Sequence, residues 1–167
     1  DIINVKRITE VTGGVPTPMG CRSLLPQWIN PETNKEEYYG RQNLGVVTIN
    51  LVRIGLESGG SKDEFWKILN DRIKVAKDGL LYRAKRIKEA IPDNAPVLYK
   101  EGGFGSRLSE EESVDKLFYN KRATLSLGYI GVYEATSCIY GLNWENNKEA
   151  KEFSVEILKR MKKCVDE

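Results

Sequence analysis

The sequence contains no histidine, and this absence removes several common enzyme chemistries from consideration. Without histidine, the chain cannot build a Ser-His-Asp or Cys-His relay from its own residues, nor a histidine-containing zinc site. The glycine-rich phosphate loops G-x-x-x-x-G-K-S/T and G-x-G-x-x-G are also missing. The chemistry that remains must use thiols, carboxylates, amides and hydroxyls.

Cysteine is scarce as well, with only Cys21, Cys138 and Cys164 in 167 residues. Their odd number and wide separation do not fit a disulfide framework, so a reducing cytoplasm is the expected location. None of them has the close spacing of a zinc knuckle or a C-x-x-C redox motif, and no metal site is predicted. Cys138 and Cys164 fall in predicted helices and are interpreted as structural residues.

Long apolar runs and a strong excess of one charge are lacking too. No apolar run approaches the ~20 residues needed to span a bilayer, and the N-terminus does not resemble a secretory signal. The net charge is +2, from 26 Lys and Arg against 24 Asp and Glu. Because polyanion binding needs a concentrated basic surface, neither nucleic acid nor a membrane is an expected partner. The densest basic cluster, Lys159, Arg160, Lys162 and Lys163, is interpreted as a solvated helix end.

What is present alternates between strand and helix patterns, which predicts an α/β fold. The apolar run from Leu44 to Leu51 is typical of a strand covered on both faces. Ser61 and Glu64 form a capping box. The apolar spacing that follows, from Phe65 to Ile91, predicts a helix of about 28 residues that ends at Pro92. Gly79, in the middle of this helix, leaves room for a close contact.

Shorter patterns predict the remaining elements. Strands are expected at 2–5, 96–100 and 122–127, and helices at 110–120, 129–140 and 147–165, with a turn from Gly102 to Gly105. The segment from Gly13 to Cys21 has two prolines and three glycines in nine positions, which prevents a regular helix or a central strand. This segment is therefore a shaped loop with Cys21 at its end. The chain opens on Asp1 rather than methionine, which suggests a processed chain or a segment of something longer.

Three segments together resemble the catalytic subunit of anaerobic (class III) ribonucleoside-triphosphate reductases. They are Met19-Gly20-Cys21-Arg22-Ser23, the run GRQNLGVVTINL from Gly40 to Leu51, and the run ATLSLGYIGVYE from Ala123 to Glu134. The opening of the long helix, KDEFWK from Lys62 to Lys67, is also similar. The segments occur in the family's order, and the resemblance covers nearly the whole chain. It identifies the chain as an internal fragment of such an enzyme.

The resemblance implies that residues 1–167 form a single segment of a ten-stranded α/β barrel of the glycyl-radical enzyme and ribonucleotide reductase type. A finger loop at about residues 13–23 would carry the radical cysteine, Cys21. In the family a glycyl radical oxidises this thiol, the thiyl radical removes the ribose 3′ hydrogen, and the 2′ hydroxyl leaves as water. Hydrogen-atom transfer suits a neutral thiol in a dry site, which agrees with a cysteine that has no histidine partner.

The resemblance also implies the residues that hold the substrate. Asn43 is assigned to catalysis beside Cys21, because an amide can hold the 2′ and 3′ hydroxyls without changing the charge. Judged without the resemblance, Asn43 fits a turn cap before the strand equally well. Met19 and Ser23 are expected to line the same pocket. The turn Ser126, Leu127, Gly128, Tyr129, Ile130 and Gly131 is expected to receive substrate phosphates through backbone N–H groups and the helix dipole. Its alternative is a purely structural turn.

The resemblance places no cofactor in this chain. It assigns to the parent enzyme a glycyl radical, made by an S-adenosylmethionine/iron–sulfur activase, and a structural zinc elsewhere. The implied partners are a ribonucleoside triphosphate, the remaining segments of the reductase, the activase and a second subunit of a homodimer. Because the regulatory and glycyl-radical parts are not in this sequence, the chain on its own is expected to be inactive.

Two other functions compete with this one. The first is a non-catalytic nucleotide-binding or assembly module derived from the same barrel, which would keep the phosphate turn and tolerate loss of the thiol. The second is a glycyl-radical lyase, which is less favoured because such an enzyme does not need the Asn43 to Leu51 motif in this form.

Part of a barrel would expose strand edges and an apolar sheet face. The isolated chain is therefore expected to be oligomeric, domain-swapped or poorly soluble, which sedimentation and hydrophobic-dye binding would measure. A monodisperse monomer that binds no dye would contradict this expectation.

Overall fold

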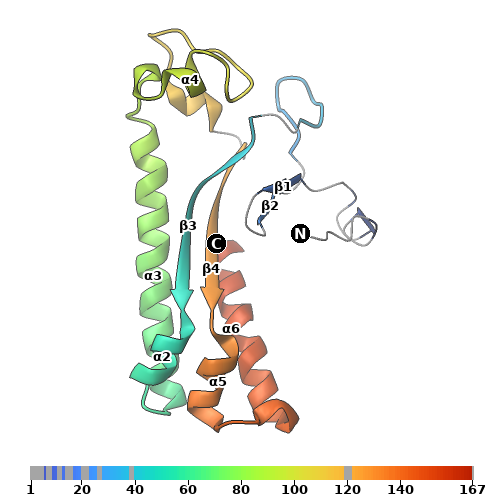
Figure 1. The fold of residues 1–167 in the computed structure, drawn as a ribbon, viewed down its shortest axis with the longest axis vertical. Coiled ribbons are helices and arrows are strands. Elements are labelled where there is room, and N and C mark those ends of the chain that lie inside the picture. The colour runs from blue at the N-terminus through green and yellow to red at the C-terminus, as the bar shows by residue number, and fades with distance from the viewer. Residues whose placement is uncertain are drawn as a thin grey trace. The chain divides into compact units, whose positions relative to one another are not determined.

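A computed structural model of the chain describes residues 6, 9–10, 13, 17–19, 23–25, 28–37, 40–118 and 122–166 (Figure 1). The chain divides into two compact units, the first made of Asp1–Gly45 and Arg83–Leu125, the second of Val46–Tyr82 and Ser126–Glu167. The strands are β1 (Thr17–Met19), β2 (Ser23–Leu25), β3 (Gln42–Asn50) and β4 (Ala123–Ile130). The helices are α2 (Leu51–Glu57), α3 (Lys62–Ile87), α4 (Pro96–Tyr99), α5 (Val132–Tyr140) and α6 (Lys148–Asp166). Three 3₁₀ turns, Pro92–Asn94, Val114–Leu117 and Trp144–Asn146, complete the described elements. The predicted α/β class is confirmed.

Strands β3 and β4 pair as a two-stranded sheet and run in the same direction, and each passes directly into a helix (Figure 1). Burial alternates along the second half of β3: Ile49 is buried, whereas Val46 is 53% exposed. The prediction of a strand covered on both faces is therefore wrong for the described residues, since they cover only the face that carries Ile49. The face of β3 that carries Val46 is therefore exposed, and an exposed apolar sheet face is the feature from which we expect the isolated chain to associate.

Helix α3 follows the predicted pattern closely. The Ser61 Oγ accepts the Glu64 N–H at 3.3 Å, as half of the predicted capping box requires. The buried positions recur at helical spacing and are Phe65, Leu69, Ile73, Ala76 and Leu80. The helix ends at Ile87, however, so the predicted extent of the helix to Ile91 is wrong, and the Ile91 side chain is 55% exposed. A Cβ atom at Gly79 would meet no described atom within 4 Å, so the expected close contact is not made there.

The core of the second unit lies where α3, α6 and the ends of the two strands meet. Its centre is aromatic: the Phe65 and Phe153 ring centroids are 5.1 Å apart, and Trp66 lies 4.8 Å from Phe153. Leu51 and Ile157 are fully buried beside them. On α6, Ala150, Phe153, Ile157 and Met161 are buried at helical spacing, while Leu158 is half-buried. Dispersion and apolar burial in this cluster hold the helices against the sheet.

The first unit has a smaller core of its own, made of Tyr99, Leu108, Val114, Leu117 and Phe118. The rings of Tyr99 and Phe104 lie 5.8 Å apart. A loop that carries Gly102 and Gly105, both with positive φ, closes over this core, so the predicted turn there is confirmed. Arg122 fixes the loop, because its guanidinium donates to the Phe104 carbonyl at 3.1 Å.

Three element predictions need correction. The segment from Pro96 is a short helix rather than a strand, because proline at the first helical position has a suitable φ and needs no N–H partner. The predicted 110–120 helix is reduced to the 3₁₀ turn Val114–Leu117, which Ser113 caps. Strand β4 continues through Gly128 to Ile130, so the following helix starts at Val132 rather than 129, although it ends before Gly141 as predicted.

The predicted strand at 2–5 lies outside the described residues. Among the residues that are described, no helix combines the length and apolar character needed to cross a membrane. The predicted last helix at 147–165 is confirmed by α6.

Candidate functional site

The segment predicted to carry the reactive thiol is framed by an antiparallel hairpin. Strand β1 pairs with β2 so that Thr17 faces Leu25, Pro18 faces Leu24 and Met19 faces Ser23. Cys21 itself lies outside the described residues and is the middle residue of the three that separate Met19 from Ser23 in the sequence. The structure thus brings the backbones of two predicted pocket residues together as strand partners, on either side of position 21.

Asn43 lies near the start of β3 and is half-buried. Its Oδ1 accepts the Gly45 N–H at 2.9 Å, a contact that stays within the strand. The carbonyl end of this side chain therefore has a local structural role, as the alternative interpretation of Asn43 allows. The amide end carries the donor that the predicted ribose contact needs.

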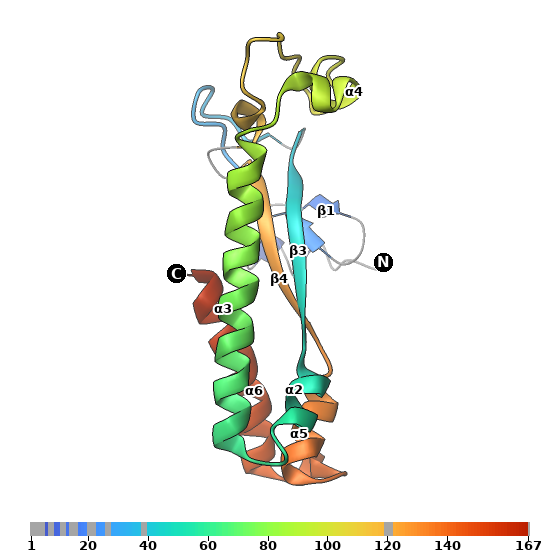
Figure 2. The same cartoon turned by 90° about the vertical axis from the view of Figure 1, so that its left-hand side faces the viewer.

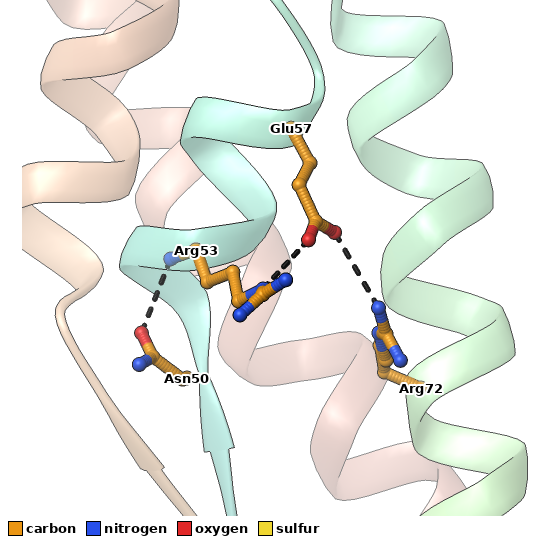
Figure 3. Close-up of polar contacts among 4 residues, drawn as sticks. All are labelled: Asn50, Arg53, Glu57 and Arg72. Atoms are coloured by element: carbon orange, nitrogen blue, oxygen red, sulfur yellow. Dashed lines mark hydrogen bonds and ion pairs between the residues drawn. The ribbon is translucent and has the colours of Figure 1, made fainter.

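The two parallel strands end at adjacent strand-to-helix turns in the second unit. At the first, Asn50 caps α2, and its Oδ1 accepts the Arg53 N–H at 3.1 Å (Figure 3). Arg53 bonds Glu57 at 2.7 Å, and Glu57 also meets Arg72 of α3 at 3.4 Å (Figure 3). These contacts, above all the hydrogen bond from Arg53, hold the pKa of Glu57 below its usual value. Glu57 thus remains charged and neutralises part of the guanidinium charge at this turn.

The second turn has no such cap. Gly131 starts α5 with φ of 80° and, among the described residues, no side chain caps this end of the helix. The first N–H groups of α5, from Val132 onward, therefore point outward without a side-chain acceptor at the cap. Because β4 continues to Ile130, these donors lie one to three residues beyond the turn predicted at Ser126 to Gly131. The physical reason is Gly131, whose left-handed backbone ends the strand and starts the helix.

Glycines hold these two turns close together. A Cβ at Gly131 would lie 2.1 Å from the Val52 Cγ2, and a Cβ at Gly55 would lie 3.0 Å from the Ala135 Cα and 3.1 Å from the Cys138 Sγ. Helices α2 and α5 can pack this closely only because both positions lack a side chain. At the carboxyl end of the sheet, the starts of α2 and α5 thus lie close together. A side chain, Asn50, caps α2, whereas no described side chain caps α5.

The residues of the predicted phosphate turn have different surroundings. Ser126 is half-buried, and Leu127 packs against the core of the second unit. Gly128 lets β4 approach β3, since a Cβ there would lie 3.3 Å from the Thr48 Oγ1. Tyr129 and Ile130 are exposed. Of the six residues predicted to bind phosphate, from Ser126 to Gly131, only Gly131 lies at the start of α5, next to the first backbone N–H groups of the helix.

The sequence patterns missed α2 and its cap, Asn50. Gly55 inside the helix and Gly59-Gly60 after it hide the apolar spacing of so short an element. A signal was present nonetheless: an asparagine directly after a β-branched strand is a common N-cap. Cys138 and Cys164 are free and half-buried, and Cys164 packs against the core of the second unit. This placement supports their interpretation as structural residues.

A parallel strand pair in which each strand leads directly into a helix defines an α/β protein. Residues 2–167 match the family model described as anaerobic ribonucleoside-triphosphate reductase. The chain belongs to this family, and the resemblance seen in its sequence motifs is confirmed.

Individual relatives agree with the family model. The chain is 39% identical over 168 residues to the anaerobic ribonucleoside-triphosphate reductase of Escherichia coli K12, covering 100% of this chain and 24% of that protein. It is 42% identical over 140 residues to the protein of the same name from Enterobacteria phage T4, covering 80% of this chain and 23% of that protein. The crystal structure of the Thermotoga maritima anaerobic ribonucleotide reductase with citrate in the active site is similar, with TM-score 0.53 and 28% identity over 76% of this chain and 24% of that one. The chain thus spans about a quarter of the length of the relatives it matches.

Proposed function

We propose that this chain is the part of an anaerobic ribonucleoside-triphosphate reductase that supplies the radical thiol, Cys21, and a ribose-binding amide, Asn43. The observation that carries the proposal is the family match over residues 2–167, which includes the motif around each of the two residues. The pairing of Met19 with Ser23 supports it, because it places the backbones of two predicted pocket residues side by side.

In the proposed reaction, Cys21 acts as a one-electron reagent. Its thiol loses a hydrogen atom, and the resulting thiyl radical takes the 3′ hydrogen atom of the ribose. The 2′ hydroxyl then leaves as water after protonation, and the thiol hydrogen returns to the 3′ position at the end. A glycyl radical on another segment supplies the first oxidation. The two electrons of the net reduction come from an external reductant, for which formate is the family's example, with a second cysteine from a segment N-terminal to this one.

Asn43 and the start of α5 would position the substrate. The amide of Asn43 holds the ribose hydroxyls without adding a charge that would disfavour a neutral thiol. The uncapped N–H groups after Gly131 receive the substrate phosphates, and the helix dipole adds to the attraction. Ser126 and Tyr129 belong to the same predicted contact region, and Met19 and Ser23 to the walls around the thiol.

The rest of the enzyme follows from the same proposal. The strands of this chain would be part of a ten-stranded α/β barrel completed by the other segments of the reductase, with residues 13–23 as its finger loop. A second subunit would form a homodimer, an S-adenosylmethionine/iron–sulfur activase would generate the glycyl radical, and a structural zinc would lie outside this chain. The oxygen-sensitive chemistry and the free cysteines are consistent with a reducing cytoplasm.

Reconstitution tests the proposal. The chain is mixed under anoxia with the complementary segments and the activase, and deoxyribonucleotide formation from ribonucleoside triphosphates is measured. Cys21→Ala is expected to leave no measurable product, whereas Cys164→Ala, a matched control, is expected to retain activity. Undiminished product with Cys21→Ala would refute the radical role. Undiminished nucleotide binding with no product from the wild-type chain would instead favour a non-catalytic module.

Asn43 needs a variant that separates its two roles. Asn43→Asp keeps an oxygen to accept the Gly45 N–H but removes the amide donor and adds a charge. We expect kcat to fall roughly 10²-fold or more, the usual cost of losing one positioned donor in an active site, and the unfolding midpoint is measured beside it. A variant that lost stability but retained kcat would show that Asn43 is a structural residue only.

A further inference from the structure

The second unit contains a groove that the proposed reaction does not use. It lies between α3 and α6, which pack together through Phe65, Trp66 and Phe153, and Figure 2 shows α6 beside the first half of α3. The groove has a volume of about 570 Å³. Small-molecule sites typically span roughly 300–1,000 Å³, so the groove could hold a ligand of ordinary size.

The groove is strongly basic. Lys74 and Lys77 line it from α3, and Arg160 and Lys163 line it from α6, against a single carboxylate, Glu156. Its formal charge of three positive units exceeds the +2 of the whole chain, so positive charge is concentrated here. The sequence predicts only a solvated helix end for the α6 cations, because it does not reveal that two lysines of α3 face them.

Two of these cations lack an acidic partner. Within the part of the chain that the structure describes, no carboxylate forms an ion pair with Lys74 or Lys163. Elsewhere in the unit Lys62 pairs with Glu149, and Lys67 pairs with Glu64 at 3.3 Å. Asp71 and Asp78 lie near Lys74 along α3, but neither lines the groove. The unpaired ammonium groups make this groove more attractive to an anion than the turn at Arg53 and Arg72, where Glu57 already occupies both guanidinium groups.

Other groups give the groove a fixed shape. The Arg160 guanidinium stacks over the Trp66 ring at 3.9 Å and bonds Glu156 at 3.2 Å, so its position is set before any ligand arrives. Ile73 is buried, and Cys164 also lines the groove. Asn70 adds an amide that can donate and accept.

We propose that this groove binds a small polyphosphate anion, such as the triphosphate group of a nucleotide. Two pairs of cations on facing helices match several phosphate groups in a row, and ammonium groups bind phosphate as compact point charges. The binding is separate from the uncapped start of α5 and does not require Cys21. Because the lysines are solvent-accessible, it weakens as salt is raised, with a Debye length of about 10 Å at 0.1 M.

Cys164 provides a direct readout. In the Cys21→Ala chain, the rates at which iodoacetamide alkylates Cys164 and Cys138 are followed by peptide mass spectrometry while tripolyphosphate is added. Tripolyphosphate is expected to slow the alkylation of Cys164 severalfold and to leave Cys138 unchanged. Sodium chloride at matched ionic strength should protect neither. A nucleoside triphosphate is the second arm: protection equal to that of tripolyphosphate indicates recognition of phosphate groups, and stronger protection indicates added base or sugar contacts.

The matched variants locate the site. The double substitution Lys74→Glu and Lys163→Glu is expected to weaken binding roughly tenfold or more, since it reverses two charges that contact the anion. The double substitution Lys67→Glu and Lys148→Glu places the same charge change on the same two helices but outside the groove, and should change the affinity less than twofold. Circular dichroism checks folding, and Lys74→Gln with Lys163→Gln is a milder pair should the reversal unfold the chain. Equal losses in both double variants, or protection of Cys164 that survives the groove substitutions, would overturn the proposal.

Discussion

Replacing Phe65 by alanine is expected to lower the free energy of unfolding by about 3–5 kcal/mol, the usual cost of removing a buried phenyl ring. Phe65 is fully buried and touches both Trp66 and Phe153, so its loss leaves a cavity at the junction of α3 and α6. The neighbouring rings of Trp66 and Phe153 belong to two different helices, and they cannot both move inward to fill the cavity. Urea denaturation followed by the helical circular-dichroism signal measures the change.

Val75→Ala is the control for Phe65→Ala. Val75 lies on the same helix but is 67% exposed, so its truncation should change the unfolding free energy by no more than about 0.5 kcal/mol. If both variants lost stability equally, α3 would not be packed against α6 through the Phe65 face, and the groove between these helices would also be in doubt.

Gly131→Ala is expected to be the second most damaging of the substitutions to stability, at about 2–5 kcal/mol. The left-handed φ of 80° costs an alanine roughly 1–2 kcal/mol. The new Cβ would also lie 2.1 Å from the Val52 Cγ2, and relieving such an overlap typically costs about 1–3 kcal/mol. The thermal midpoint and the urea midpoint should both fall.

Two further variants identify the cause of that loss. Gly79→Ala makes the same chemical change on an exposed turn of α3 where a Cβ meets nothing, and should stabilise the chain by about 0.5–1 kcal/mol. Adding Val52→Ala to Gly131→Ala removes the overlap and should restore part of the lost stability, leaving the backbone strain. Should Gly131→Ala be neutral, the close approach of α2 to α5 would be disproved.

Gly131 also shows why stability and activity must be measured together. It belongs to the predicted phosphate turn, yet its position against Val52 is sufficient to explain why the residue must be glycine. Loss of activity in Gly131→Ala is evidence for a phosphate contact only to the extent that it exceeds the loss of folded protein.

Local signals in the sequence predicted the long elements correctly. The Ser61 cap and the apolar spacing from Phe65 to Leu80 define α3 without help from distant contacts, although the helix ends at Ile87, earlier than Pro92 alone predicts. The alternating pattern of β4 and the terminating Gly141 after α5 are equally local. Errors arose where two local preferences compete: Pro96 permits a helix start as well as an extended backbone, and Gly128 stays in a strand because a close neighbour, Thr48, favours it there.

The candidate site could be predicted only through family resemblance. Nothing local distinguishes Cys21 from an ordinary loop cysteine, and the register that pairs Met19 with Ser23 depends on the hairpin as a whole. The side-chain oxygen of Asn43 accepts the Gly45 N–H within the same strand. From the sequence alone, an asparagine at this position is interpreted as the cap of a turn. The basic groove could not be predicted at all, because its cations come from helices about 90 residues apart in sequence and meet only when α3 and α6 pack.

The pairing of β3 with β4 has a consequence for synthesis of the protein. Asn50 and Ile130 end the two strands, and 80 residues separate them in the chain. At roughly 5–20 residues per second, a ribosome needs several seconds after releasing β3 to deliver its partner. During that interval the Val-Val-Thr-Ile stretch of the nascent chain has no strand to join, and slow non-local closure prolongs its exposure. We therefore expect holdase chaperones that recognise extended apolar segments to bind Val46 to Ile49 in the nascent chain, and we expect expression yield to depend on their supply.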